Sequence, residues 1–197
     1  MVSIESLKNG GVLARVTNFE SESRIFQLAE DGKKSLKKLT GDLFNPHTLG
    51  YDARACFFED DRLVLVEGQE DVVFLKHALE QLCINQEIRF FGYGAGGSGK
   101  IIHIATILQE LGYEKICCLY DGDKEKEANV TRTKFLSYLV LVLDKDDIRD
   151  KYDAQKNLVK EGVFDKERKI KDDCKTWLKN LILEILDKIY DVNNAGS

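Results

Sequence analysis

The sequence predicts an α/β fold, with a parallel sheet of about four strands and helices on both of its faces. After residue 60, short apolar runs alternate with segments whose apolar residues recur every three or four positions, as in amphipathic helices. Strands that alternate with helices in this way form parallel sheets with helices on both faces. The chain has 197 residues, 43% of them hydrophobic, which suits one core of moderate size.

Each strand of this sheet is predicted from a short apolar run. The four runs are residues 62–67 (RLVLVE), 87–93 (EIRFFGY), 115–120 (KICCLY) and 138–144 (YLVLVLD). Between them, helices are expected from helical spacing of apolar residues over 72–82 and 101–111, and from a polar segment over 127–136. The apolar stripe over 178–189 predicts a further amphipathic helix.

The two ends of the chain have different patterns from the middle. Residues 1–45 are expected to form a β-rich segment, the tail of an upstream domain, because short apolar runs are separated there by turn-forming residues. Its cluster of lysines is interpreted as a solvated face: Lys33, Lys34, Lys37 and Lys38. A connection around Pro46 then separates the sheet domain, 46–150, from what precedes it. Residues 151–197 are expected to form a helical extension.

Charge and cysteine content limit the classes of function. The net charge of -5 argues against a dedicated basic surface for nucleic acid, although a metal that bridges acidic side chains to phosphate would avoid this objection. The five cysteines are odd in number and show no C-x-x-C spacing, which favours reduced core thiols. No signal peptide is recognisable, and no apolar run approaches the ~20 residues that cross a bilayer. We therefore expect a cytoplasmic protein without a membrane partner.

Acidic residues follow two of the predicted strands. Glu67 ends the first strand and Asp71 lies in the first turn of the next helix, while Asp121 and Asp123 follow KICCLY. Parallel sheets bind ligands at the carboxyl ends of their strands, so these four side chains are expected to converge. Such a cluster raises its own pKa values unless a cation is bound, and its oxygen ligands favour Mg²⁺ or Mn²⁺. Replacing Asp123 by Asn would then relieve repulsion and stabilise the metal-free fold.

Two other interpretations of the same residues stay open. The acidic residues could simply cap a helix and a turn. Residues 94–100 also match the first seven positions of the phosphate-binding loop G-x-x-x-x-G-K-[ST], which would indicate a nucleotide-binding protein. Ile101, however, stands where that loop needs a hydroxyl group to bind Mg²⁺.

Three segments, LVLVEGQEDVVFLKHAL, GYGAGGSGKI and ICCLYDGD, together resemble the Toprim domain of topoisomerases, primases and several nucleases. The longer run NPHTLGYDARACFFEDDRLVLVEGQED is similar to the nuclease domain of the OLD (overcoming lysogenization defect) family of ATP-dependent endonucleases. The YDGD motif also resembles that of haloacid dehalogenase-like phosphatases, but Glu125 replaces the threonine expected two residues after the second aspartate.

The Toprim resemblance implies a DNA endonuclease with two Mg²⁺ or Mn²⁺ ions, one held by Glu67 and Asp71 and the other by Asp121 and Asp123. Glu67, Asp121 and Asp123 would be catalytic. A lysine would support the transition state, with Lys100 as the first choice. The other lysine candidates are Lys124 and Lys169. The family's third acidic element is replaced here by Arg149, with Asp147 and Asp150 as possible substitutes.

Partners follow from the same resemblance. DNA is the expected substrate, and an ABC-type ATPase would act in cis or in trans. A homo-oligomer is also considered. The alternative is a non-catalytic or regulatory Toprim module that binds a partner ATPase. Retention of the four carboxylates favours the nuclease.

Overall fold

A three-stranded parallel sheet lies at the centre of the computed structural model, which describes residues 14–19, 22–40 and 61–191. The strands are β3 (Arg62–Leu65), β4 (Lys115–Tyr120) and β5 (Leu139–Val142), in that spatial order. β4 is the middle strand: Leu65 pairs with Cys118, and Tyr120 pairs with Val142. The prediction of a parallel α/β sheet is therefore confirmed.

Both faces of the sheet are buried. Successive β4 residues alternate between two hydrophobic clusters, so that Cys118 and Tyr120 belong to one cluster and Cys117 and Leu119 to the other. A strand with two buried faces has to be apolar at nearly every position, as KICCLY is. This continuous apolar pattern is why β4 could be predicted without alternation of polar residues.

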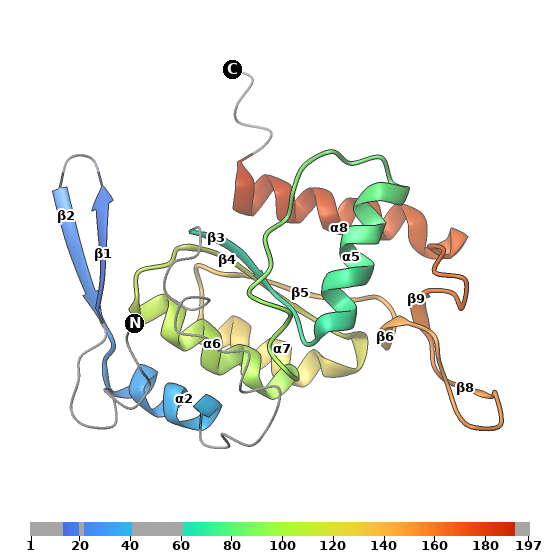
Figure 1. Cartoon of the computed structure of the whole chain (residues 1–197), viewed down its shortest axis with the longest axis horizontal. Coiled ribbons are helices and arrows are strands. Elements are labelled where there is room, and N and C mark those ends of the chain that lie inside the picture. The colour runs from blue at the N-terminus through green and yellow to red at the C-terminus, as the bar shows by residue number, and fades with distance from the viewer. Residues whose placement is uncertain (1–13, 20–21, 41–60, 192–197) are drawn as a thin grey trace.

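Helices cover the two faces (Figure 1). On one face lie α6 (Ser98–Glu110) and α7 (Glu125–Lys134), whose buried residues belong to the first cluster. On the other lie α5 (Gln69–Gln81) and α8 (Asp172–Tyr190), whose buried residues belong to the second. All four were predicted, with ends that differ by a few residues.

The predicted strand over residues 87–93 is reduced to one bridge, in which Phe90 pairs with Val64 in parallel. Val64 donates to the Arg89 carbonyl oxygen at 2.8 Å, and Phe91 donates to the Val64 carbonyl oxygen at 3.1 Å. The chain turns away at once, because Gly92 has a φ of 53°. The prediction of a full strand is therefore wrong, although the segment does lie at this edge of the sheet.

The N-terminal part is not composed of strands alone. β1 (Ala14–Phe19) and β2 (Glu22–Gln27) form an antiparallel hairpin, which projects from the body in Figure 1. A helix follows, α2 (Glu30–Thr40), which packs against α6. Its acidic first turn and basic last turn both suit the helix dipole, a signal that the strand prediction overlooked. The predicted connection around Pro46 lies outside the described residues.

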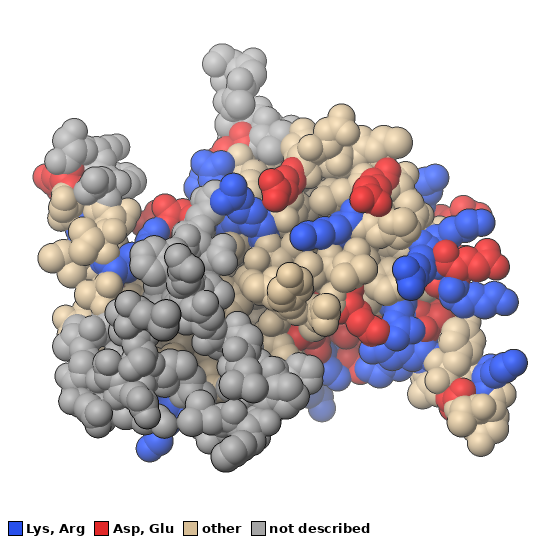
Figure 2. Space-filling model, in the orientation of Figure 1, with Lys and Arg blue, Asp and Glu red and all other residues tan. Residues whose placement is uncertain are grey.

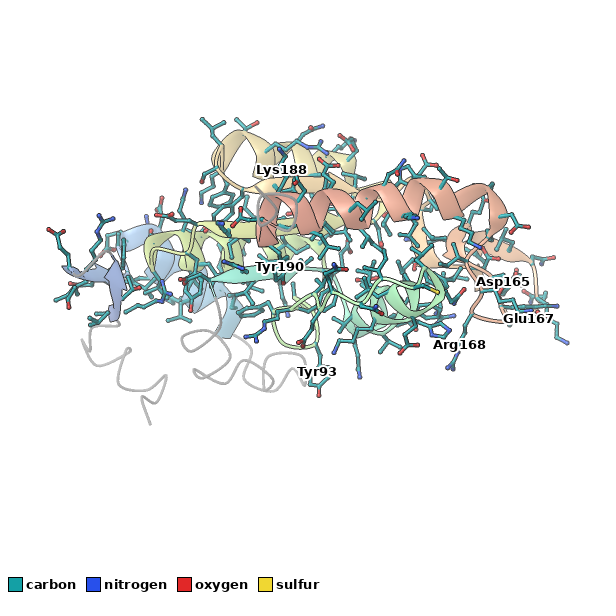
Figure 3. The ribbon with its side chains drawn as sticks, turned by 90° about the horizontal axis from the view of Figure 1, so that it is seen from above. Tyr93, Asp165, Glu167, Arg168, Lys188 and Tyr190 are labelled. Atoms are coloured by element: carbon teal, nitrogen blue, oxygen red, sulfur yellow. The ribbon has the colours of Figure 1, made fainter. Side chains whose placement is uncertain are left out.

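The C-terminal part contains short strands before its helix. β6 (Asp147–Arg149) pairs in parallel with β9 (Gly162–Phe164), and between them β7 (Lys151–Tyr152) and β8 (Leu158–Lys160) form a hairpin. α8 then packs on the sheet, and the Tyr190 hydroxyl near its end, labelled in Figure 3, accepts a hydrogen bond from Arg89 N at 2.7 Å. The expected C-terminal helix is therefore present as α8, but short strands that were not expected precede it. Within the described ranges no helix is long and apolar enough to cross a membrane.

Candidate acidic site

The parallel pairing of β3 and β4 brings Glu67 and Asp121 together at the carboxyl end of the sheet. Each lies just beyond its strand, and Asp121 N donates to Glu67 Oε1 at 3.2 Å. Asp121 is only 8% exposed. The convergence of these two side chains follows from the sheet topology alone.

Asp71 joins them from the first turn of α5. Its Oδ2 accepts a hydrogen bond from Gly68 N at 2.7 Å, so that it does cap the start of the helix. Capping does not account for its burial, because an ordinary cap remains hydrated and Asp71 is 8% exposed. The negative charge of Glu67 repels the Asp71 carboxylate and raises the pKa of Asp71.

Asp147, at the start of β6, is the fourth carboxylate of the site. It is 2% exposed, and its Oδ2 accepts no well-formed hydrogen bond from the described residues, although Lys151 Nζ lies 2.6 Å away. Asp150 is placed differently: its Oδ1 accepts hydrogen bonds from Gly162 N at 2.9 Å and from Lys171 Nζ at 2.7 Å. Of the two substitutes considered for the third acidic element, the structure brings Asp147 alone to the cluster.

We call Glu67, Asp71, Asp121 and Asp147 the acidic site. Burial, together with the charges of the other three carboxylates, raises the pKa of Asp121 to about 8. Burial and the charges of Glu67 and Asp147 raise the pKa of Asp71 to about 6, against the opposing effect of the Gly68 amide. Burial also raises the pKa of Glu67. Such shifts are typical of carboxylates that are held together without a cation.

Asp123 differs from these four residues. Its two oxygens lie 2.8 Å from Lys124 Nζ and 2.7 Å from Lys160 Nζ, and its side chain is 28% exposed. Burial alone would raise its pKa, but the hydrogen bonds to the two lysines outweigh this and leave the pKa lowered. The charge of Asp123 does repel Glu67, but Asp123→Asn would also remove two ion pairs, so the structure does not support the expected stabilisation of the metal-free fold. A role for Asp123 as a metal ligand remains a prediction.

The lysines nearest the acidic site were largely missed. Lys151 pairs with Asp147, and Lys160 lies 3.9 Å from the same carboxylate. Both come from the β7–β8 hairpin beyond residue 150, outside the segments that the sequence motifs cover. Acidic atoms below α5 and basic atoms beside them toward β6 are visible in Figure 2.

The lysines chosen from the sequence lie in various places. Lys124 faces Asp123, as described above. Lys169 is exposed and lies 3.7 Å from Glu167. Lys100 is half-buried at the start of α6, and its Nζ forms no hydrogen bond or ion pair with a described residue. Arg149, at the position of the expected acid, binds Glu70 at 2.6 Å.

The glycine-rich loop packs on the backbone beside Glu67. The amides of Gly96 and Gly97 both donate to the Glu67 carbonyl oxygen at 2.8 Å. Amides used in this way are not directed at a phosphate, which weighs against the nucleotide-loop interpretation. Gly94 has a φ of +95°, and a Cβ there would lie 2.5 Å from the Gly68 carbonyl carbon. Tyr93, at the loop's outer side, points away from the body in Figure 3.

Gly122, between the two aspartates, is required by close packing. A Cβ at this position would lie 2.4 Å from the Lys145 carbonyl oxygen, which accepts a hydrogen bond from Gly122 N at 2.9 Å. This contact fixes the D-G-D turn against the segment that leads to β6. It therefore helps to bring Asp147 to Asp121.

The donor chemistry of the acidic site fits a hard divalent cation, because all four side chains offer carboxylate oxygens and one buried oxygen lacks a hydrogen bond. As the side chains stand, no three His, Cys, Asp or Glu residues of the described part are arranged to hold an ion. Asp71 is turned toward the Gly68 amide and Glu67 toward the Asp121 amide. Binding would require small side-chain rotations.

No protein-family model matches the sequence, and a search of curated proteins finds no match.

Proposed function

We propose that the protein is a metal-dependent DNA endonuclease of the Toprim type, most similar to the nuclease domain of OLD-family enzymes. The observation that carries the proposal is the convergence of Glu67, Asp71, Asp121 and Asp147 at the carboxyl end of a parallel sheet. Because β3 pairs in parallel with β4, the glutamate and D-x-D segments on which the Toprim resemblance rests lie at the same edge of the sheet.

The four carboxylates of the acidic site would hold Mg²⁺ or Mn²⁺. When bound, such ions activate a water molecule and stabilise the leaving 3′ oxygen of a phosphodiester. A bound cation would also favour the ionised form of Asp121, whose pKa near 8 otherwise keeps it largely protonated at neutral pH. The acid cluster is therefore suited to exchange protons for metal.

The surrounding lysines supply the positive charge that an approaching phosphodiester needs. Lys151 and Lys160 flank Asp147, and Lys160 also binds Asp123. Both ammonium groups can move toward a phosphate oxygen, because lysine is a flexible point charge rather than a fixed fork. We assign the supporting role to these lysines, in place of Lys100 or Lys169. An ABC-type ATPase partner remains part of the proposal on the resemblance alone.

The test is a plasmid-cleavage assay with Mg²⁺, Mn²⁺ or chelator. The parent should nick or linearise supercoiled DNA only with a divalent metal. Asp121→Asn and Asp147→Asn should each lower the rate by at least about 100-fold, a loss typical of removing a group that stabilises transition-state charge. Asp146→Asn, a neighbouring exposed position, is the matched control and should cut like the parent.

Two different outcomes would contradict the proposed nuclease activity at the acidic site. Cleavage that persists in Asp121→Asn and Asp147→Asn would move the activity away from the acidic site. A folded parent that never cuts DNA, with or without metal, would leave the non-catalytic Toprim module as the better interpretation.

A further inference from the structure

A second charged hollow lies away from the acidic site, between α2 and the helices α6 and α7. It has a volume of about 600 Å³. We call it the basic pocket, and its main lining residues are Lys34, Lys37 and Lys38 of α2, Ile102 and His103 of α6, and Lys134 of α7. The lysine cluster interpreted as a solvated face thus forms one wall of a concave site.

The charge of this pocket is poorly balanced within the described structure. Its described lining carries four lysines against one aspartate, Asp31, in a chain whose net charge is -5. Asp31 lies 3.7 Å from Lys34. Lys37 and Lys38 form no ion pair with any described residue, and Lys134 donates to the Thr106 hydroxyl at 2.8 Å rather than to a carboxylate. An anion would relieve the mutual repulsion of these ammonium groups.

The same excess of positive charge affects the pKa of His103. Its Nδ1 lies 3.3 Å from the Ser35 hydroxyl oxygen. Burial lowers the pKa of His103, and the charges of Lys38 and Lys134 lower it further. Two lysines from different helices therefore act on one ring inside the hollow.

We propose that the basic pocket binds the oligophosphate group of a small molecule, such as a nucleoside triphosphate or a free oligophosphate. Lysine ammonium groups neutralise several phosphate oxygens without demanding a single planar geometry, and lysine is a common phosphate ligand. The volume exceeds the needs of one phosphate and lies in the range of small-molecule sites. Ile102 and the His103 ring give one wall an apolar surface on which a base could lie. The proposal is independent of the acidic site.

The experiment is calorimetric titration of the full chain with sodium tripolyphosphate, in chelator so that no metal takes part. The parent should bind, and binding should weaken as salt increases. The double variant Lys38→Gln/Lys134→Gln should raise the Kd by roughly tenfold or more, since charged hydrogen bonds are lost. The matched control is Lys33→Gln on the same helix, because Lys33 pairs with Glu30 and does not line the pocket.

Further arms of the experiment separate the ligand sources. If ATP binds as tightly as tripolyphosphate, the pocket recognises the phosphates. If ATP binds more tightly, the base also contributes to binding. An NMR titration of His103 in the parent provides a readout that needs no variant: tripolyphosphate should raise its pKa by bringing negative charge to the ring.

The proposal is overturned if the parent does not bind tripolyphosphate, if the double variant binds it equally, or if Lys33→Gln weakens binding as much. It is also overturned if the double variant loses affinity for a DNA oligonucleotide but keeps its affinity for tripolyphosphate. That last outcome would make the pocket a DNA-backbone contact.

Discussion

Asp121 shows how one residue can be essential to a site and unfavourable to the fold. Its main-chain amide binds Glu67, while its carboxyl group is buried beside three other acids. Neither capping nor turn formation requires an acid at a position that is 8% exposed. A group that costs stability in this way is more often kept for binding or chemistry than for structure.

The stability of the metal-free fold should depend on pH through Asp121. The pKa of Asp121 is about 8 in the folded chain, against 3.8 for an ordinary aspartate. The contribution of this group to the free energy of unfolding is therefore complete below about pH 3.8. That contribution falls as the pH rises toward 8, by at most about 1.4 kcal/mol per pH unit for one proton. Denaturant unfolding in chelator at pH 6 and 8 should therefore show a clear loss of stability in the parent.

Asp121→Asn should flatten that dependence. Asp71, with a pKa of about 6, loses most of its own contribution to the free energy of unfolding below about pH 6. The slope of stability against pH between pH 6 and 8 therefore belongs mainly to Asp121. Asp146→Asn, at an exposed neighbouring position, should keep the parent's slope. Equal slopes in parent and Asp121→Asn would mean that the carboxyl group is ionised normally in the fold.

At the scale of elements, the glycine-rich loop shows that a match in spacing does not establish a nucleotide-binding role. Its spacing matches a phosphate-binding loop, but the structure uses its amides and its glycines to pack against the turn after β3. Gly94 lies against the Gly68 backbone, which leaves no room for a side chain. The loop therefore supports the position of Glu67 through close packing of its backbone.

Gly94→Ala should destabilise the protein by roughly 1–3 kcal/mol, the cost of a strained backbone position together with a direct clash. Gly99→Ala is the matched control, because its Cβ would meet no atom within 4 Å and its position in α6 favours alanine. Urea unfolding measures both. If Gly99→Ala loses as much stability as Gly94→Ala, contact with the Gly68 backbone is not the cause of the loss at Gly94.

At the scale of the whole molecule, the sheet and three of the four residues of the acidic site were predictable from the sequence. The apolar runs of β3 and β4 and the acids that follow them determine where Glu67, Asp71 and Asp121 lie. Asp147 was only one of two alternatives, because its place depends on how β6 pairs with β9 rather than on local pattern. Lys151 and Lys160 were missed for the same reason, since they lie on the hairpin between those strands.

Because the acidic site is assembled from segments far apart in the sequence, metal binding should stabilise the fold as a whole, and this can be measured without a substrate. A metal that binds only the folded chain stabilises it by about 1.4 kcal/mol at ten times its Kd. For a chain of this length the melting temperature should rise by roughly 3 to 6 °C in millimolar Mn²⁺ compared with chelator. Asp121→Asn and Asp147→Asn should each shrink the shift, because each removes a buried carboxylate oxygen.

Asp123→Asn gives the discriminating comparison in the same thermal melts. Because Asp123 is paired with Lys124 and Lys160, its loss should lower the free energy of unfolding in chelator by about 1 kcal/mol or less, and the melting temperature slightly. If Asp123 leaves its lysines to bind metal, its variant will also lose part of the Mn²⁺ shift. If the shift is unchanged, the metal is held by the four carboxylates of the acidic site alone. No shift in the parent would contradict metal binding by the acidic site.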